Sequence, residues 1–225
     1  MKTKDDFIRF ALASGALKFG EFKTKAGRLS PYFFNTGEFA DGASLNTLAQ
    51  FYAQALLAYE AHSSQAFDML FGPAYKGITL ASATAVTLAQ QGRNLPFCFN
   101  RKETKDHGEG GTLIGAGLRG RVVIVDDVIS AGTSVRQSVK IIRDAGAIPA
   151  AVLITVDRME RGGTADAPTG ASAVQEIERE FGLPVITVVN LNDVMAFLDN
   201  GVTQDSPLAA YRDKVAAYRT RYGVT

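Results

Sequence analysis

Short apolar runs alternate along the chain with longer segments of helical periodicity, and this alternation restricts the fold more than any other feature. The runs lie at Phe67–Phe71, Leu95–Phe99, Arg121–Val125, Ala150–Val156 and Pro184–Val189. Between them apolar side chains recur at helical spacing. Near-continuous apolar strands separated by helices are typical of a parallel sheet covered on both faces. We therefore predict a doubly wound, Rossmann-like α/β fold with a parallel sheet of about five strands.

The N-terminal part of the chain departs from this alternation. Helical patterns at Thr3–Ser14 and Ser44–Glu60 flank two short aromatic-rich runs, Leu17–Lys23 and Pro31–Asn35. The turn residues between the two runs predict a β-hairpin. We therefore expect a small N-terminal subdomain of helices and a hairpin.

The C-terminal part is predicted to be helical. Ser206 is a suitable N-cap and is followed by proline at the first helical position, which predicts a helix over Pro207–Tyr222. We expect a single domain with three parts: the N-terminal subdomain (1–62), the α/β core (63–190) and C-terminal helices (191–225).

The composition excludes several classes of protein. The single cysteine, Cys98, allows no intramolecular disulfide and no multi-cysteine zinc site. Within its apolar run this residue is expected to be an inert buried thiol. The 24 basic residues nearly balance the 23 acidic ones, whereas a nucleic-acid-binding domain is usually strongly basic. No apolar run approaches the roughly 20 residues of a membrane span. We therefore expect a cytoplasmic globular protein that binds neither nucleic acid nor membrane.

The segment Val122–Ser134 is the strongest local signal. An apolar strand leads into two carboxylates, Asp126 and Asp127, then into the small-residue turn Ser130–Ser134, and an amphipathic helix follows. Small residues let a phosphate approach the backbone, and Gly132 can adopt dihedral angles that other residues avoid. The N–H groups and dipole of the following helix favour an anion at the same place. The segment therefore predicts a phosphate site, beside which the carboxylates meet ribose hydroxyls or a hydroxyl coordinated to Mg²⁺.

Two common phosphate-binding patterns do not describe this segment. The GxxxxGK[ST] pattern is absent, and the glycine-rich stretch Gly115–Gly120 precedes the strand, whereas a dinucleotide fingerprint follows one. An acidic helix start capped by Asp126 or Asp127 is the structural alternative. With its four apolar residues, two acids and Gly-Thr turn, Val122–Ser134 resembles the phosphoribosyl diphosphate (PRPP) motif of type I phosphoribosyltransferases.

Four further segments narrow this resemblance. They are, in chain order, Arg28–Asn35, Phe71–Ile78, Asn100–Gly111 and Asp157–Arg161. Together with the PRPP motif they resemble the orotate phosphoribosyltransferase family over nearly the whole chain. The resemblance implies a Mg²⁺-dependent pentosyl transfer from PRPP to orotate, which yields orotidine 5′-monophosphate and pyrophosphate in UMP biosynthesis. It also implies a homodimer whose subunits share active sites, with the N-terminal subdomain as a hood over the PRPP-binding core.

The segment Arg101–Gly111 concentrates positive charge. Arg101, Lys102, Lys105 and His107 fall within seven residues, and glycines follow. Lysine and arginine bind phosphates, and glycines allow a loop to open and close. A closed loop would hold the leaving pyrophosphate and exclude water, which competes for the sugar carbon. Taken alone, the segment could equally be a solvated charged loop.

Other site residues depend more on the resemblance. Tyr75 and Lys76 follow an apolar run and open a helix, where backbone amides suit pyrophosphate, and the resemblance assigns both to PRPP. Arg158 can form a bidentate pair with the orotate carboxylate, which a lysine cannot match. Asp157 is expected to pair with a neighbouring arginine.

The implied site comprises three groups. The catalytic residues are Lys102, Lys105, His107, Asp126 and Asp127. The residues implied to bind PRPP are Lys25, Tyr75, Lys76, Arg101, Lys102, Lys105, His107, Asp126, Asp127, Val128, Ile129, Ser130, Ala131, Gly132, Thr133 and Ser134. The residues implied to bind orotate are Phe33, Phe34, Ser130 and Arg158. Mg²⁺ is expected to be held mainly by PRPP and water, with no side-chain ligand assigned.

Two other functions share parts of this pattern. A phosphoribosyltransferase for a purine would keep the PRPP motif, but a purine has no carboxylate for Arg158. A regulatory protein that binds PRPP without catalysis would usually carry a DNA-binding segment. Met1–Phe22 is too short and too poor in base-reading residues for a helix-turn-helix module.

Overall fold

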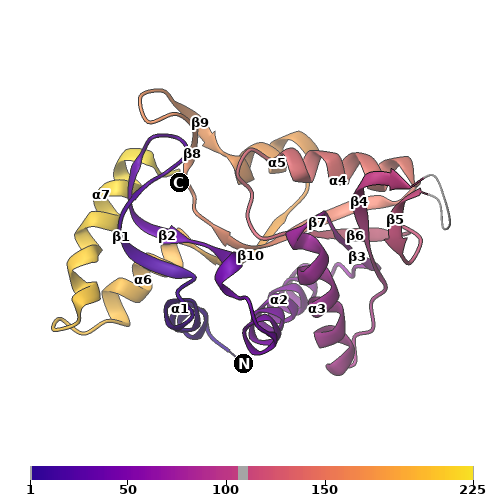
Figure 1. The fold of residues 1–225 in the computed structure, drawn as a ribbon, viewed down its shortest axis with the longest axis horizontal. Helices are drawn as coiled ribbons and strands as arrows, with labels where there is room; N and C mark the ends of the chain where they lie inside the picture. Colours follow the sequence, from indigo (N-terminus) through magenta and orange to yellow (C-terminus); the bar gives the residue numbers. More distant parts are fainter. Residues whose placement is uncertain (1, 106–110, 225) are drawn as a thin grey trace.

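The computed structural model describes residues 2–105 and 111–224. Within these residues one central sheet is accompanied by two small hairpins, and helices surround them (Figure 1). In chain order, the elements are α1 (Lys4–Ala13), β1 (Leu17–Lys23), β2 (Leu29–Phe34), η1 (Thr36–Glu38), α2 (Gly42–Ser63), β3 (Met69–Gly72), α3 (Lys76–Gln90), β4 (Phe97–Lys105), β5 (Gly111–Gly115), β6 (Arg121–Val125), α4 (Thr133–Asp144), β7 (Ile148–Asp157), β8 (Arg161–Gly163), β9 (Pro168–Ser172), α5 (Ala173–Phe181), β10 (Val185–Asn190), α6 (Leu191–Asn200), η2 (Pro207–Tyr211) and α7 (Arg212–Tyr222).

The central sheet has the strand order β10-β7-β6-β3-β4-β5. Its first five strands in that order run parallel, and β5 pairs antiparallel with β4. The predicted doubly wound α/β fold is therefore confirmed, with β5 as an additional edge strand. The sequence did not reveal β5 because its short glycine-bounded run, Gly111–Gly115, resembles a loop. Strand β4 also extends to Lys105, beyond the residues that pair with β3, and there it pairs with β5 alone.

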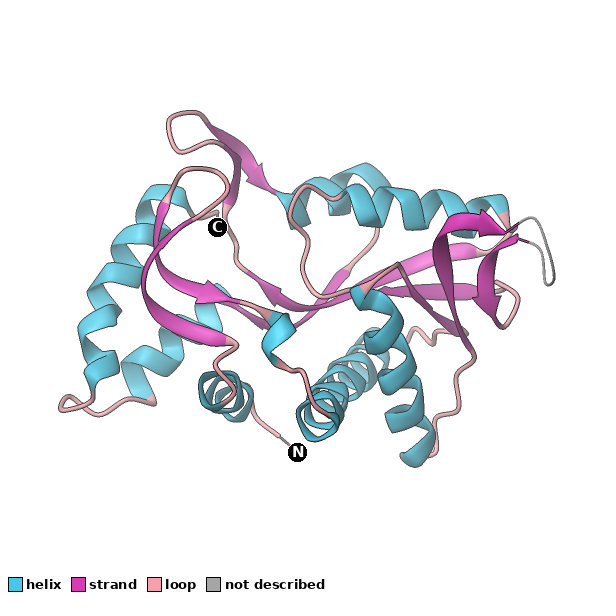
Figure 2. Ribbon diagram, viewed as in Figure 1, coloured by secondary structure: helices cyan, strands magenta, loops and turns pink. Residues whose placement is uncertain are grey.

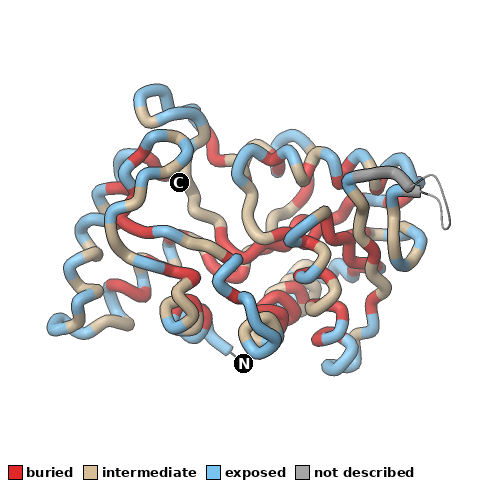
Figure 3. The backbone as a smooth tube through the Cα atoms, in the orientation of Figure 1, coloured by how far each residue is buried: buried red, intermediate tan, exposed pale blue. Residues whose placement is uncertain are grey.

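Helices cover both faces of this sheet, as the alternation of β6 shows. Val123 and Val125 belong to the apolar cluster shared with α1, α2 and α3, whereas Val122 and Ile124 belong to the cluster shared with α4 and α5. Figure 2 shows these two helical layers on opposite sides of the strands, and Figure 3 shows the buried strands between them. Both faces of β6 are therefore apolar, as its continuous apolar sequence predicts.

The predicted N-terminal hairpin is formed by β1 and β2, which pair antiparallel outside the central sheet. The C-terminal helices pack on it: the ring of Phe19 lies 5.5 Å from that of Tyr211, and the ring of Tyr32 lies 6.1 Å from that of Tyr218. Figure 1 shows α7 beside the hairpin. Both ends of the chain therefore build this subdomain. The boundaries after residues 62 and 190 stay predictions.

Two local expectations differ from the structure. Pro207–Tyr222 is not one continuous α-helix, because the residues up to Tyr211 form the 3₁₀-helix η2, and Ser206 caps this turn through Leu208 N. The strands β8 and β9 form a hairpin that the sequence did not indicate, because its glycine-rich segment has no alternating pattern. Among the described residues, no helix combines the length and the apolar character needed to cross a bilayer.

The strand order places a switch point between β3 and β6. These neighbouring parallel strands are followed by α3 and α4, which pack in different apolar clusters on opposite faces of the sheet. The chain segments after the two strands therefore diverge, and such a divergence at the carboxyl ends of strands creates the ligand crevice of open α/β sheets. The candidate site lies at this edge.

Candidate active site

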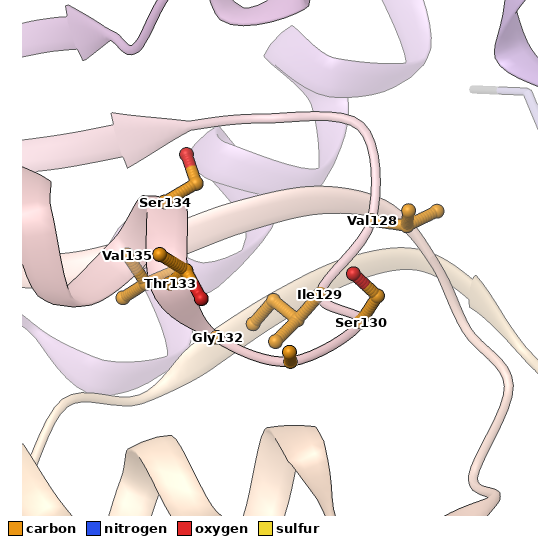
Figure 4. Close-up of a pocket in the computed structure, with 8 residues that line it drawn as sticks. Val128, Ile129, Ser130, Gly132, Thr133, Ser134 and Val135 are labelled. Carbon is orange, nitrogen blue, oxygen red and sulfur yellow. The ribbon is translucent and has the colours of Figure 1, made fainter.

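The loop after β6 surrounds a cavity of about 250 Å³ lined by residues 128–135 (Figure 4). Gly132 turns the chain with a φ of +73°, and an added Cβ there would lie 2.8 Å from Nη1 of Arg136. That nitrogen donates to the Ala131 carbonyl oxygen (2.7 Å), which ties the loop to α4. Helix α4 begins at Thr133 without a side-chain cap. Its first N–H groups, which no side chain of the described residues caps, lie at the cavity and favour an anion such as phosphate.

Asp126 follows β6 directly and is 9% exposed. Its Oδ1 accepts a hydrogen bond from the Asp127 amide (2.9 Å), and its Oδ2 accepts one from Ser134 Oγ (2.9 Å). Burial raises the pKa of Asp126 from 3.8 to about 6, although these two hydrogen bonds act in the opposite direction. The Asp126 carboxylate thus lies beside the phosphate loop, where burial makes its ionised form less favourable than it is in water.

Asp127 joins three separate parts of the chain. Its Oδ2 accepts hydrogen bonds from Lys76 Nζ (2.6 Å) and from Thr36 Oγ1 (2.8 Å), and its Oδ1 accepts one from the Val128 amide (2.9 Å). Lys76 Nζ also donates to Thr36 Oγ1 (3.2 Å). The structure therefore brings the predicted residues Lys76 and Asp127 into direct contact, together with a threonine that the sequence did not single out.

Lys76 reaches Asp127 because the turn after β3 packs closely against β6. A Cβ added at Gly77 would lie 2.6 Å from Cδ of Pro73 and 2.7 Å from the Val125 carbonyl oxygen. Only glycine fits this approach, so the start of α3 is held beside the end of β6. This close packing explains why residue 77 is a glycine, which is also a residue that βα turns favour.

Two fully buried residues with hydroxyl groups, Tyr52 and Thr155, form hydrogen bonds to the backbone of Asp126 and Asp127. The Tyr52 hydroxyl donates to the Asp126 carbonyl oxygen (2.8 Å) and forms a short hydrogen bond with Thr155 Oγ1. The Thr155 amide donates to the Asp127 carbonyl oxygen (2.9 Å). Burial raises the pKa of Tyr52 well above 10, so this hydroxyl stays a donor. The backbone of the acidic pair is therefore fixed by β7 and α2.

Arg158, the predicted orotate residue, follows β7. Its Nη2 donates to Oε1 of Glu160 (2.6 Å), which also accepts from the Tyr32 hydroxyl (3.0 Å). The Arg158 guanidinium lies 5.6 Å from the centre of the Tyr32 ring. Its Nε is buried and has no hydrogen-bond partner among the described residues. Glu160 thus fixes one side of the guanidinium, and the Arg158 side chain as a whole stays 33% exposed.

Among the described residues no arginine pairs with Asp157, so that expectation is wrong. Its Oδ1 accepts a hydrogen bond from the Met159 amide (2.8 Å), which turns the chain after β7. Burial raises the pKa of Asp157. Because Met159 adopts a φ of +50° in this turn, Arg158 is directed to Glu160 instead.

Arg28 connects the N-terminal hairpin to the β8–β9 hairpin. It is 2% exposed, and its guanidinium lies 4.9 Å from the centre of the Tyr222 ring. It donates to four successive carbonyl oxygens, at 2.7, 2.8, 3.3 and 3.4 Å, on Arg161, Gly162, Gly163 and Thr164. The Ala165 amide also donates to the Ala26 carbonyl oxygen (2.9 Å). These bonds hold the two hairpins together above Glu160.

The two predicted phenylalanines have different surroundings. Phe33 is 44% exposed, and its ring lies 5.5 Å from that of Phe22. Phe34 is partly buried, and its ring lies 6.3 Å from that of Phe7 in the apolar core. Phe33 is thus the more accessible of the two.

The remaining predicted residues are less well connected. Lys102 Nζ lies 4.5 Å from the centre of the Tyr75 ring, and Tyr75 is 67% exposed. Lys105 ends β4, and only its backbone is described, whereas His107 lies outside the described residues. Lys25 is exposed in the turn after β1, and no described contact joins Lys25 or Arg101 to the acidic pair.

A parallel sheet with a phosphate-sized loop and two carboxylates at its switch point defines the class of protein. The family model described as the phosphoribosyl transferase domain matches residues 45–184. This match covers β3 to α5 and includes the loop after β6. The chain is therefore a phosphoribosyltransferase.

Comparison with individual proteins narrows the class. The chain is 64% identical over 222 residues to the orotate phosphoribosyltransferase of Ralstonia pickettii, covering 99% of this chain and 96% of that protein. It is 65% identical over 218 residues to that of Cupriavidus necator, covering 97% and 93%. The crystal structure of orotate phosphoribosyltransferase from Francisella tularensis is 37% identical, with a TM-score of 0.83, covering 97% of this chain and 99% of that one. The chain belongs to the orotate phosphoribosyltransferase family, which confirms the resemblance.

Proposed function

We propose that this protein transfers the 5-phosphoribosyl group from PRPP to orotate, with orotidine 5′-monophosphate and pyrophosphate as products. The observation that carries the proposal is the contact of Lys76 with Asp127 (2.6 Å) beside the cavity of the phosphate loop. One sugar phosphate can span these features. Its phosphate would occupy the loop, its ribose hydroxyls would donate to the carboxylates, and its pyrophosphate would meet the lysine.

Each part of PRPP then has a partner of suitable chemistry. Residues 128–134 would bind the 5′-phosphate, because the start of α4 offers N–H groups that no described side chain caps. Asp126 and Asp127 would accept hydrogen bonds from the ribose hydroxyls. Lys76, with Lys102 from β4, would balance the charge of the pyrophosphate. The transition state is expected to resemble an oxocarbenium ion, so charge on the leaving group must be stabilised as it develops.

Mg²⁺ fits this site as an ion held mainly by the substrate. The described residues contain no group of three or more histidine, cysteine or carboxylate side chains arranged to hold a metal. Asp126 and Asp127 already accept hydrogen bonds on all four oxygens, so ribose and pyrophosphate oxygens with water would supply most ligands. When bound, Mg²⁺ would neutralise part of the pyrophosphate charge.

Orotate would bind on the Arg158 side of the crevice. The Arg158 side chain is 33% exposed, and a planar carboxylate would accept from a guanidinium edge in a bidentate manner. Ser130 supplies a hydroxyl from the phosphate loop, and the exposed ring of Phe33 offers a face for the pyrimidine. A purine presents no carboxylate to Arg158, which favours orotate as the base.

The direct test is an assay with Mg²⁺, PRPP and orotate, followed by the loss of orotate absorbance, with adenine and hypoxanthine in parallel. Turnover with orotate alone is expected, and turnover with a purine alone would overturn the proposal. Arg158→Ala should raise the KM for orotate more than the KM for PRPP. Arg158→Lys serves as the matched control, because it keeps the charge and loses the bidentate geometry.

We also propose a homodimer with shared sites, as the resemblance implies. In a single chain Lys102 lies over its own Tyr75, so the use of Lys102 by a partner must be tested. Lys102→Ala subunits are mixed with Asp126→Ala, Asp127→Ala subunits, each inactive alone. Recovered activity supports sharing across the dimer, and its absence counts against it. The cytoplasmic location stays a prediction.

A further inference from the structure

Thr36 occupies an unusual place for a residue of the N-terminal subdomain. It begins η1, directly after the segment that carries Phe33 and Phe34, and is 9% exposed. Its Oγ1 donates to Oδ2 of Asp127 (2.8 Å) and accepts from Lys76 Nζ (3.2 Å). A hydroxyl has one proton and two lone pairs, so both bonds can form together. Thr36 is thus hydrogen-bonded to both partners of the Lys76–Asp127 ion pair, whose charged atoms lie 2.6 Å apart.

The hydroxyl of Thr36 has no role in the local turn. The cap of η1 is Asn35, whose Oδ1 accepts from the Gly37 amide (3.0 Å). The remaining oxygen of Asp127, Oδ1, accepts from the Val128 amide (2.9 Å). The side-chain oxygen of Thr36 is therefore directed entirely at the ion pair of the phosphoribosyl site.

PRPP must rearrange this ion pair when it binds. The Lys76 ammonium cannot stay 2.6 Å from Asp127 and also approach the pyrophosphate closely, because it has to turn toward the new anion. When it turns, Oδ2 of Asp127 loses its charged donor. A partly buried carboxylate oxygen that loses its donors costs free energy, and the carboxylate is then held only through Oδ1. Thr36 is the donor that remains on that oxygen.

We propose that Thr36 is a positioning residue for PRPP, which holds the Asp127 carboxylate toward the ribose while Lys76 turns to the pyrophosphate. This inference rests on the proposed function, because it takes PRPP as the ligand of Lys76 and Asp127. It would also link the two substrates, since Thr36 follows the strand that carries Phe33, the residue proposed to contact the pyrimidine. Thr36 need not touch either substrate to act.

Thr36→Val tests this role, because it keeps the branched shape and removes the hydroxyl. A hydrogen bond to a charged group is worth about tenfold or more in a binding constant. We therefore expect the KM and the directly measured Kd for PRPP to rise about tenfold, with the KM for orotate changed far less. Thr36→Ser keeps the hydroxyl and should restore PRPP binding. Thr87→Val is the matched control, because Thr87 is 3% exposed but its hydroxyl donates only to the Ala83 carbonyl within α3.

A second comparison separates positioning from a general loss of structure. In an Asp127→Asn background the carboxylate that Thr36 orients is absent, so adding Thr36→Val should change the Kd for PRPP much less than it does in the wild type. Equal effects in both backgrounds, or a Kd unchanged by Thr36→Val alone, would overturn the inference. If Thr36→Val does not fold, Thr36→Ala and Thr36→Ser are compared in its place.

The failure of this inference is distinguishable from the failure of the proposed function. Calorimetric binding of PRPP to the wild type requires no turnover, so Thr36 is tested whether or not orotate reacts. If the wild type binds PRPP and Thr36→Val binds it with the same Kd, only the inference is contradicted. No binding of PRPP to the wild type would contradict both.

Discussion

Asp126 is predicted to destabilise the fold at neutral pH, and its replacement by asparagine should make the protein more stable. Burial raises the pKa of this carboxyl from 3.8 to about 6 in the native state. Between these two values the native state binds more protons than the unfolded state. The free energy of unfolding therefore falls as the pH rises through this window. At about 1.4 kcal/mol per unit of pKa, the full loss is about 3 kcal/mol.

The effect is measured by urea unfolding at pH 8 and pH 5. The chain has no tryptophan, so far-UV circular dichroism is the suitable signal. Asp126→Asn should raise the free energy of unfolding at pH 8 by up to about 3 kcal/mol, or the Tm by about 6–12 °C for a chain of this size. At pH 5 the advantage should shrink by about half, because native Asp126 is then largely protonated. Activity should fall about a hundredfold or more, since a group at the ribose is lost.

Asp41→Asn provides the control of opposite sign. Asp41 caps α2, and hydrogen bonds from the amides of Ser44 and Ala43 hold its pKa below 3.8. Its contribution to stability is present above that value and is lost as the pH falls. Asp41→Asn should therefore not stabilise the protein at pH 8. If Asp126→Asn is no more stable than the wild type at pH 8, or the difference does not depend on pH, burial does not strain this carboxylate.

Three further predictions concern the close packing at Gly77, the partner of Arg158 and the buried thiol of Cys98. Gly77→Ala should lower the free energy of unfolding by about 1–3 kcal/mol and raise the KM for PRPP, because its Cβ would lie 2.7 Å from the Val125 carbonyl oxygen. Gly42→Ala, which meets nothing within 4 Å, should do neither in the same melting and kinetic assays. Glu160→Gln removes the charge partner of Arg158 and should raise the KM for orotate severalfold more than that for PRPP; equal changes would contradict its role. Cys98 is buried with a pKa raised to about 12, so thiol reagents at pH 8 should label it only after unfolding, and rapid labelling of the native protein would refute this.

The sequence predicted the parts of the fold that repeat a simple pattern. Strand β6 was predicted at its observed bounds because every residue from Val122 to Val125 is buried on one face or the other. The β8–β9 hairpin was missed because it is held by Arg28 and not by an apolar pattern of its own. Likewise β5 depends on pairing with β4, which a short glycine-bounded run does not encode locally.

The site was predictable to the extent that its residues are contiguous. The phosphate loop and the acidic pair occupy one segment, so their proximity follows from the chain itself. Thr36 lies 91 positions from Asp127, and Tyr52 lies 103 positions from Thr155. These contacts form because the subdomain and α2 fold back on the sheet, which no local signal reports. The prediction for Asp157 failed for a local reason, because its carboxylate accepts from the Met159 amide in the turn after β7, and Arg158 pairs with Glu160.

The four carbonyl oxygens gathered by Arg28 also bear on how variants of this protein can be assembled. One guanidinium serves acceptors on Arg161, Gly162, Gly163 and Thr164, so the shape of the β8–β9 hairpin is matched to a side chain more than a hundred positions away. A chimaera that takes either hairpin alone from a relative would leave a buried cation facing misplaced oxygens. The two hairpins should therefore be exchanged together, as a single cassette.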